Sequence, residues 1–309
     1  MNILYYCTIS NQSKWLEILK KKFKGHKIMT LEDNFDFKEI DAAIVWNLPN
    51  SILKKLLSIK IIFSLGAGVD HILKLSNYNQ TPIIRIKDPK MRERMLNYVL
   101  AHILNYQLKL IFYQRAQKKK LWVDARETLL NNELTIGILG LGYIGKFVAE
   151  KLDKLNYNII GYKNSVSKSK QSFQIFTGKK LSQFISSSDI IISILPSTKQ
   201  TTDFINKKFL NKMKKKSLLI NVGRGASLNE KDVLNHLKSN NYFNVSLDVF
   251  KKEPLKKEHK FWNHPNVTIT PHIASITDIE SAIDYMYERF LIFKKKNKII
   301  SDVNLEKGY

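Results

Sequence analysis

The sequence predicts an α/β protein with two domains, each built on a parallel β-sheet with helices packed against it. Short apolar segments alternate with stretches of helical periodicity along the chain, which is typical of repeated βα units. The chain has 309 residues, and a single hydrophobic core usually divides at this length. With 44% hydrophobic residues but only 12 Gly and 7 Pro, the composition excludes a disordered, collagen-like or low-complexity chain.

The first third of the chain has the pattern of one small flavodoxin-like domain. Its apolar segments predict five strands, at residues 2–7, 27–30, 42–46, 61–64 and 83–86. Helix-period apolar positions lie between them, at 14–22 and 51–57. Single helices between successive strands favour a parallel sheet.

A longer helical pattern follows this domain. Apolar residues recur at intervals of three or four from Met91 to Tyr113, directly after Pro89, and predict one long helix. The polar segment 114–132 comes next. The pattern suits a connector that also forms a dimer contact, and it suits an ordinary core helix equally well.

The second series of strands predicts a six-stranded, doubly wound sheet of the Rossmann type. Its expected strands are 135–139, 158–162, 190–195, 217–221, 244–248 and 267–269, with helices that include 143–156 and 229–239. A last helix, at about 278–296, is long enough to return to the first domain. We therefore assign residues 1–98 plus 278–309 to the first domain and residues 99–277 to the second.

A glycine-rich turn opens this second series. Gly140, Gly142 and Gly145 form G-x-G-x-x-G directly after an apolar strand and directly before a helix that starts at Tyr143 and Ile144. The first glycine allows the tight turn, the second lets backbone approach a pyrophosphate, and the third lets helix and strand pack closely. The helix N-terminus adds N–H donors for the anion. The turn therefore predicts a dinucleotide site.

The choice of dinucleotide is expected to be made about 20 residues later, where NAD-binding sheets carry an acidic residue for the ribose 2′-OH. This chain has Lys163, Asn164 and Ser165 there, with Lys168 and Lys170 nearby. A carboxylate would repel a 2′-phosphate, so its absence favours NADP(H), with NAD(H) still possible.

The charge balance invites a nucleic-acid hypothesis that the sequence pattern does not support. The chain has 51 Lys+Arg against 27 Asp+Glu, a net charge of +24. The lysines form short scattered runs, and no arginine-and-aromatic pattern or nucleic-acid module accompanies them. We expect a solvated basic surface and no nucleic-acid partner.

Other composition features bound the cellular setting. Cys7 is the only cysteine, so an intrachain disulfide is impossible and a reducing compartment is favoured. No secretory signal pattern or apolar run of membrane-spanning length occurs, so we expect a cytoplasmic protein with no membrane contact. No Cys/His cluster has metal-ligand spacing, so no metal is expected.

Three polar landmarks follow the last three expected strands. Arg224 lies in Asn-Val-Gly-Arg-Gly, Asp248 and Glu253 lie in Asp-Val-Phe-Lys-Lys-Glu-Pro, and His272 lies in Thr-Pro-His. Open α/β sheets place their ligands at these carboxyl ends. Each residue alone could be structural, as an ion-pair partner, a helix cap or a core histidine. Together, behind a nucleotide turn, they indicate a catalytic set.

At these residues the chain resembles the D-isomer-specific 2-hydroxyacid dehydrogenase family, and within it the bacterial glyoxylate/hydroxypyruvate reductases of the A type. The resemblance spans nearly the whole chain, through residues 63–70, the glycine turn, residues 195–198, the three landmarks and the final Gly308-Tyr309. It implies a discontinuous substrate domain, a central NAD(P)-binding domain, a site between them, and a homodimer. It also implies a small 2-oxo acid as substrate.

The resemblance implies a role for each site residue. Arg224 would hold the substrate carboxylate and keto oxygen, His272 would be the acid/base, and Glu253 would orient it. Asp248 would contact the nicotinamide carboxamide. Further contacts are implied to the substrate, from Trp46 and the backbone amides of Ala67, Gly68 and Val69, and to the cofactor, from Leu195, Pro196 and Thr202. Relatives that use NADP often carry Arg where this chain has Asn164.

The chemistry supports these roles independently. Reducing a 2-oxo acid needs a hydride at carbon and a proton at oxygen, so the imidazole must carry its extra proton. A neighbouring carboxylate favours that charged form, and Glu253 can provide it for His272. The guanidinium of Arg224 presents a planar fork of donors that matches a carboxylate.

A second hypothesis comes from another class of protein. Transcriptional corepressors have a similar fold, use dinucleotide binding to control dimerisation, and keep the Arg, Glu and His residues. The net charge of +24 could serve such a role. Steep salt-dependent DNA binding would favour the corepressor, and NADPH-dependent turnover would favour the reductase.

Overall fold

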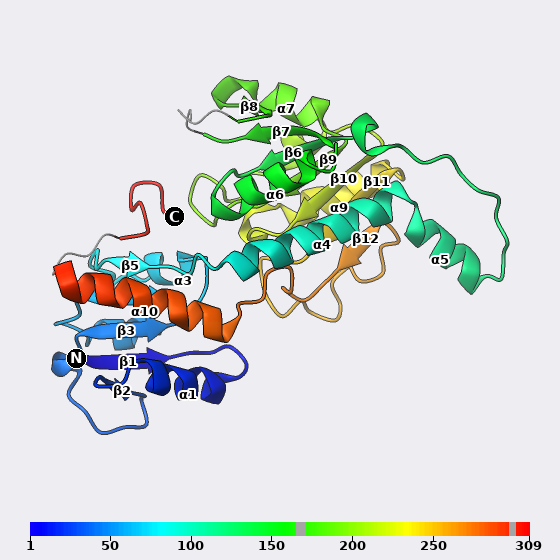
Figure 1. Ribbon diagram of the computed structural model, residues 1–309. Coiled ribbons are helices and arrows are strands. Elements are labelled where there is room, and N and C mark those ends of the chain that lie inside the picture. Colours follow the sequence, from blue (N-terminus) through cyan, green and yellow to red (C-terminus); the bar gives the residue numbers. More distant parts are fainter. Residues whose placement is uncertain (165–170, 297–300) are drawn as a thin grey trace. The chain divides into compact units, whose positions relative to one another are not determined.

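The computed structural model describes residues 1–164, 171–296 and 301–309, and the chain divides into two compact units (Figure 1). Unit 1 comprises Met1–Met91 and Thr277–Tyr309, and unit 2 comprises Arg92–Ile276. The first division falls within helix α4 (Pro89–Gln107), whereas we predicted it after residue 98 of the same helix. In the described part of the chain, no helix is long and apolar enough to cross a membrane.

Unit 1 is built on a five-stranded parallel sheet in the order β2-β1-β3-β4-β5, as expected for a flavodoxin-like domain. The strands are β1 (Asn2–Tyr6), β2 (Lys27–Met29), β3 (Ala42–Val45), β4 (Ile61–Ser64) and β5 (Ile83–Ile84). The helices are α1 (Gln12–Lys22), η1 (Phe37–Glu39), α2 (Asn50–Leu53), α3 (Asp70–Leu73) and α10 (Ile279–Lys296). All five predicted strands are present, with ends that differ by at most two residues.

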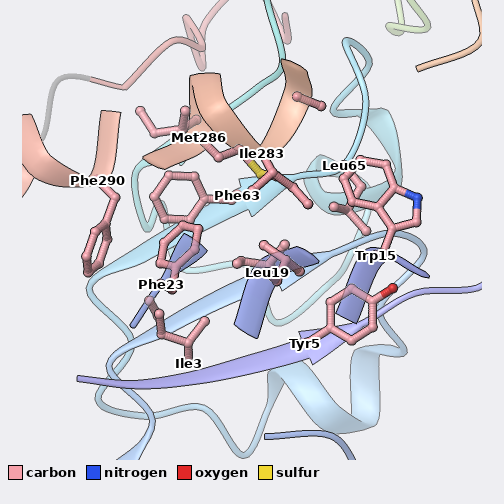
Figure 2. Close-up of a cluster of buried hydrophobic side chains, with 14 of the residues drawn as sticks. Ile3, Tyr5, Trp15, Leu19, Phe23, Phe63, Leu65, Ile283, Met286 and Phe290 are labelled. Atoms are coloured by element: carbon pink, nitrogen blue, oxygen red, sulfur yellow. The ribbon is translucent and has the colours of Figure 1, made fainter. Parts of the chain in front are cut away.

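The two faces of this sheet are covered by different helices because successive strand residues point to opposite sides. Ile3 and Phe63 face α1 and α10, whereas Leu4 and Ile62 belong to the second apolar cluster with α2 and α3. Figure 2 shows the first cluster, in which aromatic and aliphatic side chains from α1 and α10 meet above the strands. This packing holds the C-terminal helix in unit 1, so the unit is discontinuous in sequence.

Unit 2 contains a seven-stranded parallel sheet, in the order β12-β11-β10-β9-β6-β7-β8. The strands are β6 (Thr135–Leu139), β7 (Asn158–Tyr162), β8 (Gln174–Phe176), β9 (Ile190–Ser193), β10 (Ser217–Asn221), β11 (Phe243–Leu247) and β12 (Val267–Ile269). The prediction of six strands was wrong by one, because it missed β8. That strand has only three residues and begins with the exposed Gln174, so it lacks the apolar run by which the other strands were predicted.

Helices cover both faces of this second sheet, which makes it doubly wound. One face packs against α7 (Leu181–Ser187), α8 (Lys207–Leu210) and α9 (Glu230–Ser239), and the other against α4 and α6 (Tyr143–Asp153). Short 3₁₀ turns complete the unit, at η2 (Asn131–Glu133), η3 (Gly178–Lys180) and η4 (Gly225–Ser227).

The single long helix predicted across residues 91–113 was also wrong. Helix α4 ends at Gln107, and α5 (Leu110–Lys118) begins after a break. Lys109 causes the break because its φ of 56° lies in the left-handed region, which an α-helix cannot contain. The apolar period survives the break, so periodicity alone did not reveal it.

Candidate active site

The glycine-rich turn joins β6 to α6 with the geometry that its sequence predicts. Gly140 has a φ of +104°, which L side chains rarely adopt. A Cβ on Gly145 would lie 2.0 Å from the carbonyl oxygen of Gly140, so the helix can approach the turn only without a side chain there. A Cβ on Gly142 would meet nothing within 4 Å. Open space therefore lies at the N-terminus of α6, where a pyrophosphate would bind.

The strand next to β6 in the sheet is β7, and its carboxyl end lies where NAD-binding sheets recognise the ribose. Lys163 donates its backbone N–H to Phe176, and the exposed Asn164 follows it. Within the described residues at this strand end, no acidic side chain occupies the position that NAD-binding sheets use for the ribose. Ser165, Lys168 and Lys170 lie outside the described residues.

The loops after β9 and β10 are packed against one another. A Cβ on Gly223 would lie 2.5 Å from the carbonyl oxygen of Leu195, so only glycine permits this approach. Pro196 accepts a 2.6 Å hydrogen bond from the Thr201 hydroxyl, and the hydroxyl of Thr202 donates to Thr198 at 2.9 Å. The predicted cofactor contacts at Leu195, Pro196 and Thr202 thus lie in one turn beside the Arg224 loop.

Arg224 follows β10 and precedes η4. Its Nη1 donates to the backbone carbonyl of Gly223 at 2.9 Å, while its own carbonyl accepts a 2.7 Å bond from the Ser227 hydroxyl. A Cβ on Gly225 would lie 1.9 Å from the carbonyl carbon of Phe250. The two glycines that flank Arg224 therefore bring its loop against both the β9 loop and the segment that leads to Glu253.

Glu253 and His272 form a hydrogen-bonded pair. His272 Nδ1 lies 2.8 Å from Glu253 Oε2, and Oε1 accepts the backbone N–H of Phe250 at 2.9 Å. Burial alone would raise the pKa of Glu253, but these hydrogen bonds and the charges of His272 and Arg224 together lower it below its ordinary value. The charge of Arg224 thus acts on the carboxylate that contacts His272, so the three predicted catalytic residues lie near one another within unit 2.

Asp248 holds the loop that carries His272. Its Oδ1 accepts the Thr270 hydroxyl at 2.6 Å and the Ile273 N–H at 2.8 Å, while Oδ2 accepts the Ala274 N–H at 2.9 Å. The backbone N–H of His272 donates to the Asp248 carbonyl, also at 2.8 Å. His272 has a φ of 57°, a strained conformation that these four bonds maintain.

Tyr98 is a polar residue of this site that the sequence reasoning missed. Its hydroxyl lies 2.6 Å from the Thr270 hydroxyl, which links helix α4 to the Asp248 carboxylate. Burial raises the pKa of Tyr98, and burial lowers the pKa of His102, whose ring lies 4.4 Å from that of Tyr98. The only available signal was the hydroxyl of Thr270 two residues before His272.

A cavity of about 460 Å³ opens beside the His272 loop. Its lining includes Arg94, Asn97 and Tyr98 of α4 together with Ile273, Ala274 and Ile276. Charged, polar and apolar groups therefore share this hollow directly after the histidine.

The predicted substrate-binding residues of unit 1 lie after neighbouring strands. Trp46 follows β3, and the segment Ala67, Gly68 and Val69 follows β4. The six-membered ring of Trp46 covers Gly66, where a Cβ would lie 2.5 Å from the ring. Unit 1 thus brings Trp46 and the glycine-containing segment together.

A family model describes most of unit 2. It is the NAD-binding domain of the D-isomer specific 2-hydroxyacid dehydrogenases, and it matches residues 100–274. Among curated relatives, glyoxylate/hydroxypyruvate reductase A from Yersinia enterocolitica is 33% identical over 316 aligned positions and covers 100% of both chains. The protein of the same name from Serratia proteamaculans is also 33% identical, with 100% of both chains covered.

Solved structures give the same family. The NADPH-dependent glyoxylate/hydroxypyruvate reductase of Sinorhizobium meliloti, bound to NADP and sulfate, is 28% identical with a TM-score of 0.92, covering 100% of this chain and 99% of that one. A probable 2-hydroxyacid dehydrogenase of Rhizobium etli, bound to NADP, is 26% identical with a TM-score of 0.91 and the same coverage. The chain therefore belongs to the D-isomer specific 2-hydroxyacid dehydrogenase family, and residues 100–274 are its NAD-binding domain.

Proposed function

We propose that this oxidoreductase reduces small 2-oxo acids, glyoxylate to glycolate and hydroxypyruvate to D-glycerate, with NADPH as its preferred reductant. The hydrogen-bonded His272 and Glu253, with the charge of Arg224 acting on the same carboxylate, support the proposal most directly. The relatives from Yersinia and Serratia, which align over the full length of this chain, are named glyoxylate/hydroxypyruvate reductase A.

The proposed chemistry assigns the proton to His272. Because Nδ1 is directed to Glu253, Nε2 is the ring atom left to donate a proton to the keto oxygen. Glu253 keeps the ring oriented and stabilises its positive charge before transfer. Both side chains are partly exposed, at 45% and 37%, so water can return the proton after each turnover.

The remaining residues bind and orient. Arg224 would place its guanidinium against the substrate carboxylate and the keto oxygen, where negative charge develops. In unit 1, the proposal assigns the backbone amides of Ala67, Gly68 and Val69 to the carboxylate. It assigns Trp46 to limiting the size of the substrate.

The glycine turn and the carboxyl end of β7 would hold NADPH. When bound, the reduced nicotinamide supplies the hydride that adds to the substrate carbon. The open space at Gly142 fits a pyrophosphate, and the exposed Asn164 puts no negative charge against a 2′-phosphate. The Sinorhizobium and Rhizobium structures, which contain NADP, support this preference.

A steady-state assay tests the proposal. NADPH oxidation is followed by absorbance with glyoxylate, hydroxypyruvate and the bulkier phenylpyruvate, and each reaction is repeated with NADH. We expect turnover with the first two acids, a higher kcat/KM with NADPH than with NADH, and little activity on phenylpyruvate. No oxidation of either nucleotide with glyoxylate or hydroxypyruvate would refute the assignment.

We also propose that the chain works as a homodimer. Large apolar side chains lie exposed on α4, α5 and the segment that follows, among them Trp122 at 98% and Leu130 at 66%. An apolar surface of this kind is typical of a partner interface. Light scattering coupled to gel filtration should give twice the mass of the 36.0 kDa chain, and a monomer mass would exclude the dimer.

A further inference from the structure

A buried histidine joins the two segments of unit 1 that the proposed function assigns to the substrate. His71 lies in α3 with only 4% of its surface exposed. Its Nδ1 lies 3.1 Å from the backbone N–H of Asn47, and its Nε2 lies 3.0 Å from the Ser64 hydroxyl. Ser64 in turn donates to the carbonyl of Gly68 at 3.0 Å. One chain of hydrogen bonds therefore runs from the Trp46–Asn47 turn to the Gly66–Val69 loop.

The partners of this chain assign every proton in it. The N–H of Asn47 can only donate, so His71 Nδ1 must accept and carries no proton. His71 Nε2 then bears the hydrogen and donates it to Ser64 Oγ. Because Ser64 Oγ already accepts that hydrogen, its own hydrogen goes to the Gly68 carbonyl. The chain is complete only when His71 is neutral with its hydrogen on Nε2.

Ring packing reinforces the same connection. The Trp46 and His71 rings lie 4.4 Å apart between centroids at an angle of 44°. Trp46 also covers Gly66, where any Cβ would overlap its ring. The indole therefore packs against both the His71 imidazole and the backbone of Gly66.

We propose that His71 is a positioning residue, which sets the placement of Trp46 relative to the backbone amides of Ala67, Gly68 and Val69 and thereby the fit of short 2-oxo acids. The inference rests on the proposed function, because those segments must contact the substrate for His71 to affect it. His71 itself touches neither substrate nor cofactor in this role.

A spectroscopic test examines the hydrogen-bond chain without turnover. Nitrogen-15 NMR of the NADP⁺-loaded protein distinguishes a protonated from an unprotonated ring nitrogen, and the His71→Gln variant assigns the signals. We expect a neutral ring with hydrogen on Nε2 at neutral pH. A ring protonated on Nδ1, in either the neutral or the charged form, would overturn the proposal.

A kinetic test examines the positioning role with two half-replacements. In His71→Asn the side-chain oxygen keeps the acceptor for Asn47 but loses Ser64, whereas His71→Gln keeps a donor for Ser64 and loses Asn47. His71→Ala loses both. For His71→Ala we expect the KM for glyoxylate to rise about fivefold or more, with the KM for NADPH unchanged and smaller effects in the two half-replacements.

Selectivity gives a second kinetic readout. When Trp46 is no longer held, the ratio of kcat/KM for glyoxylate to that for 2-oxobutyrate should fall, because the indole can move to admit the longer acid. Ser64→Ala removes the link from the other end and should produce the same two changes. The double variant with His71→Ala should then add little further effect, since both act through one chain.

A matched histidine variant controls for general effects on unit 1. His26 lies in the same unit and contacts the N-terminal amine and the Phe290 ring, so His26→Gln should leave both readouts unchanged. If wild-type protein reduces glyoxylate and the His71 and Ser64 variants keep its KM and selectivity, the positioning role is wrong. If wild-type protein neither reduces glyoxylate nor binds oxamate with NADP⁺, the proposed function has failed, and the NMR result still decides the tautomer on which the inference depends.

Discussion

His272 Nδ1 and Glu253 Oε2 lie 2.8 Å apart, although the two residues come from different loops and are 19 positions apart in sequence. The pair depends on Asp248, which holds the His272 loop, and on Phe250, whose N–H holds Glu253. The backbone of both loops therefore determines which imidazole nitrogen faces Glu253.

Replacing the histidine tests its role as proton donor. His272→Ala should lower kcat for glyoxylate by about 10²–10⁴, the usual contribution of general acid catalysis, while NADPH still binds. Fluorescence titration with NADPH and steady-state kinetics measure the two effects separately. Turnover near the wild-type rate would remove His272 from the mechanism.

The fork geometry of Arg224 predicts that lysine cannot replace it. Arg224→Ala should raise the KM for glyoxylate and lower kcat, and Arg224→Lys should recover only part of the loss because an ammonium lacks the planar pair of donors. Kinetics of the two variants, with Lys207→Ala at an exposed position of α8 as control, provide the comparison. Full activity in Arg224→Lys would argue against a bidentate contact between the guanidinium and the substrate carboxylate.

The lowered pKa of Glu253 predicts a pH dependence of stability. Since the folded-state pKa lies below the ordinary 4.5, the carboxylate contributes stability that is fully present above pH 4.5 and is lost as pH falls through the folded value. Thermal melting of wild type and Glu253→Gln should therefore differ most at neutral pH and converge in acid. A gap between the two melting curves that widens in acid would contradict this sign.

Asp248 should act through the loop that it holds. In the wild-type protein, backbone N–H groups donate to the Asp248 carboxylate. Asp248→Asn replaces one carboxylate oxygen by an NH₂ group, which cannot accept such a bond, so about 1–3 kcal/mol of stability should be lost. Urea unfolding gives the free energy, and kcat should fall with it because His272 loses its orientation. Thr270→Val removes a bond to the same carboxylate and the contact with the Tyr98 hydroxyl, but it keeps the N–H bonds that hold the His272 loop, so kcat should fall less than in Asp248→Asn.

Replacement by alanine should affect stability at Gly145 and nucleotide binding at Gly142. Gly145→Ala puts a methyl group 2.0 Å from the Gly140 carbonyl, so the free energy of unfolding should fall. Gly142→Ala enters open space and should fold normally, yet it should weaken NADPH binding by crowding the pyrophosphate. Urea unfolding and nucleotide titration of both variants give this contrast, and equal loss of stability in the two would oppose it.

Local sequence patterns determined most strands of both sheets and the glycine turn of this protein. Each predicted strand formed because short apolar runs of three to six residues need burial in a parallel sheet. The glycine turn formed because Gly140 and Gly145 occupy places that no side chain can. The resemblance located Arg224, Glu253 and His272 because their motifs are local in sequence. The roles of these residues remain predictions.

Tertiary structure alone decided the contacts between segments distant in sequence. The periodicity of apolar residues revealed neither the break at Lys109 nor the edge strand β8. The break is a change of conformation at one residue, and β8 consists of three residues that pair with β7. Tyr98 meets Thr270 across 172 positions, and His71 joins the Trp46–Asn47 turn to Ser64. A hydrogen bond of this kind depends on where the fold places two distant segments of the chain, and residue type alone cannot specify that placement.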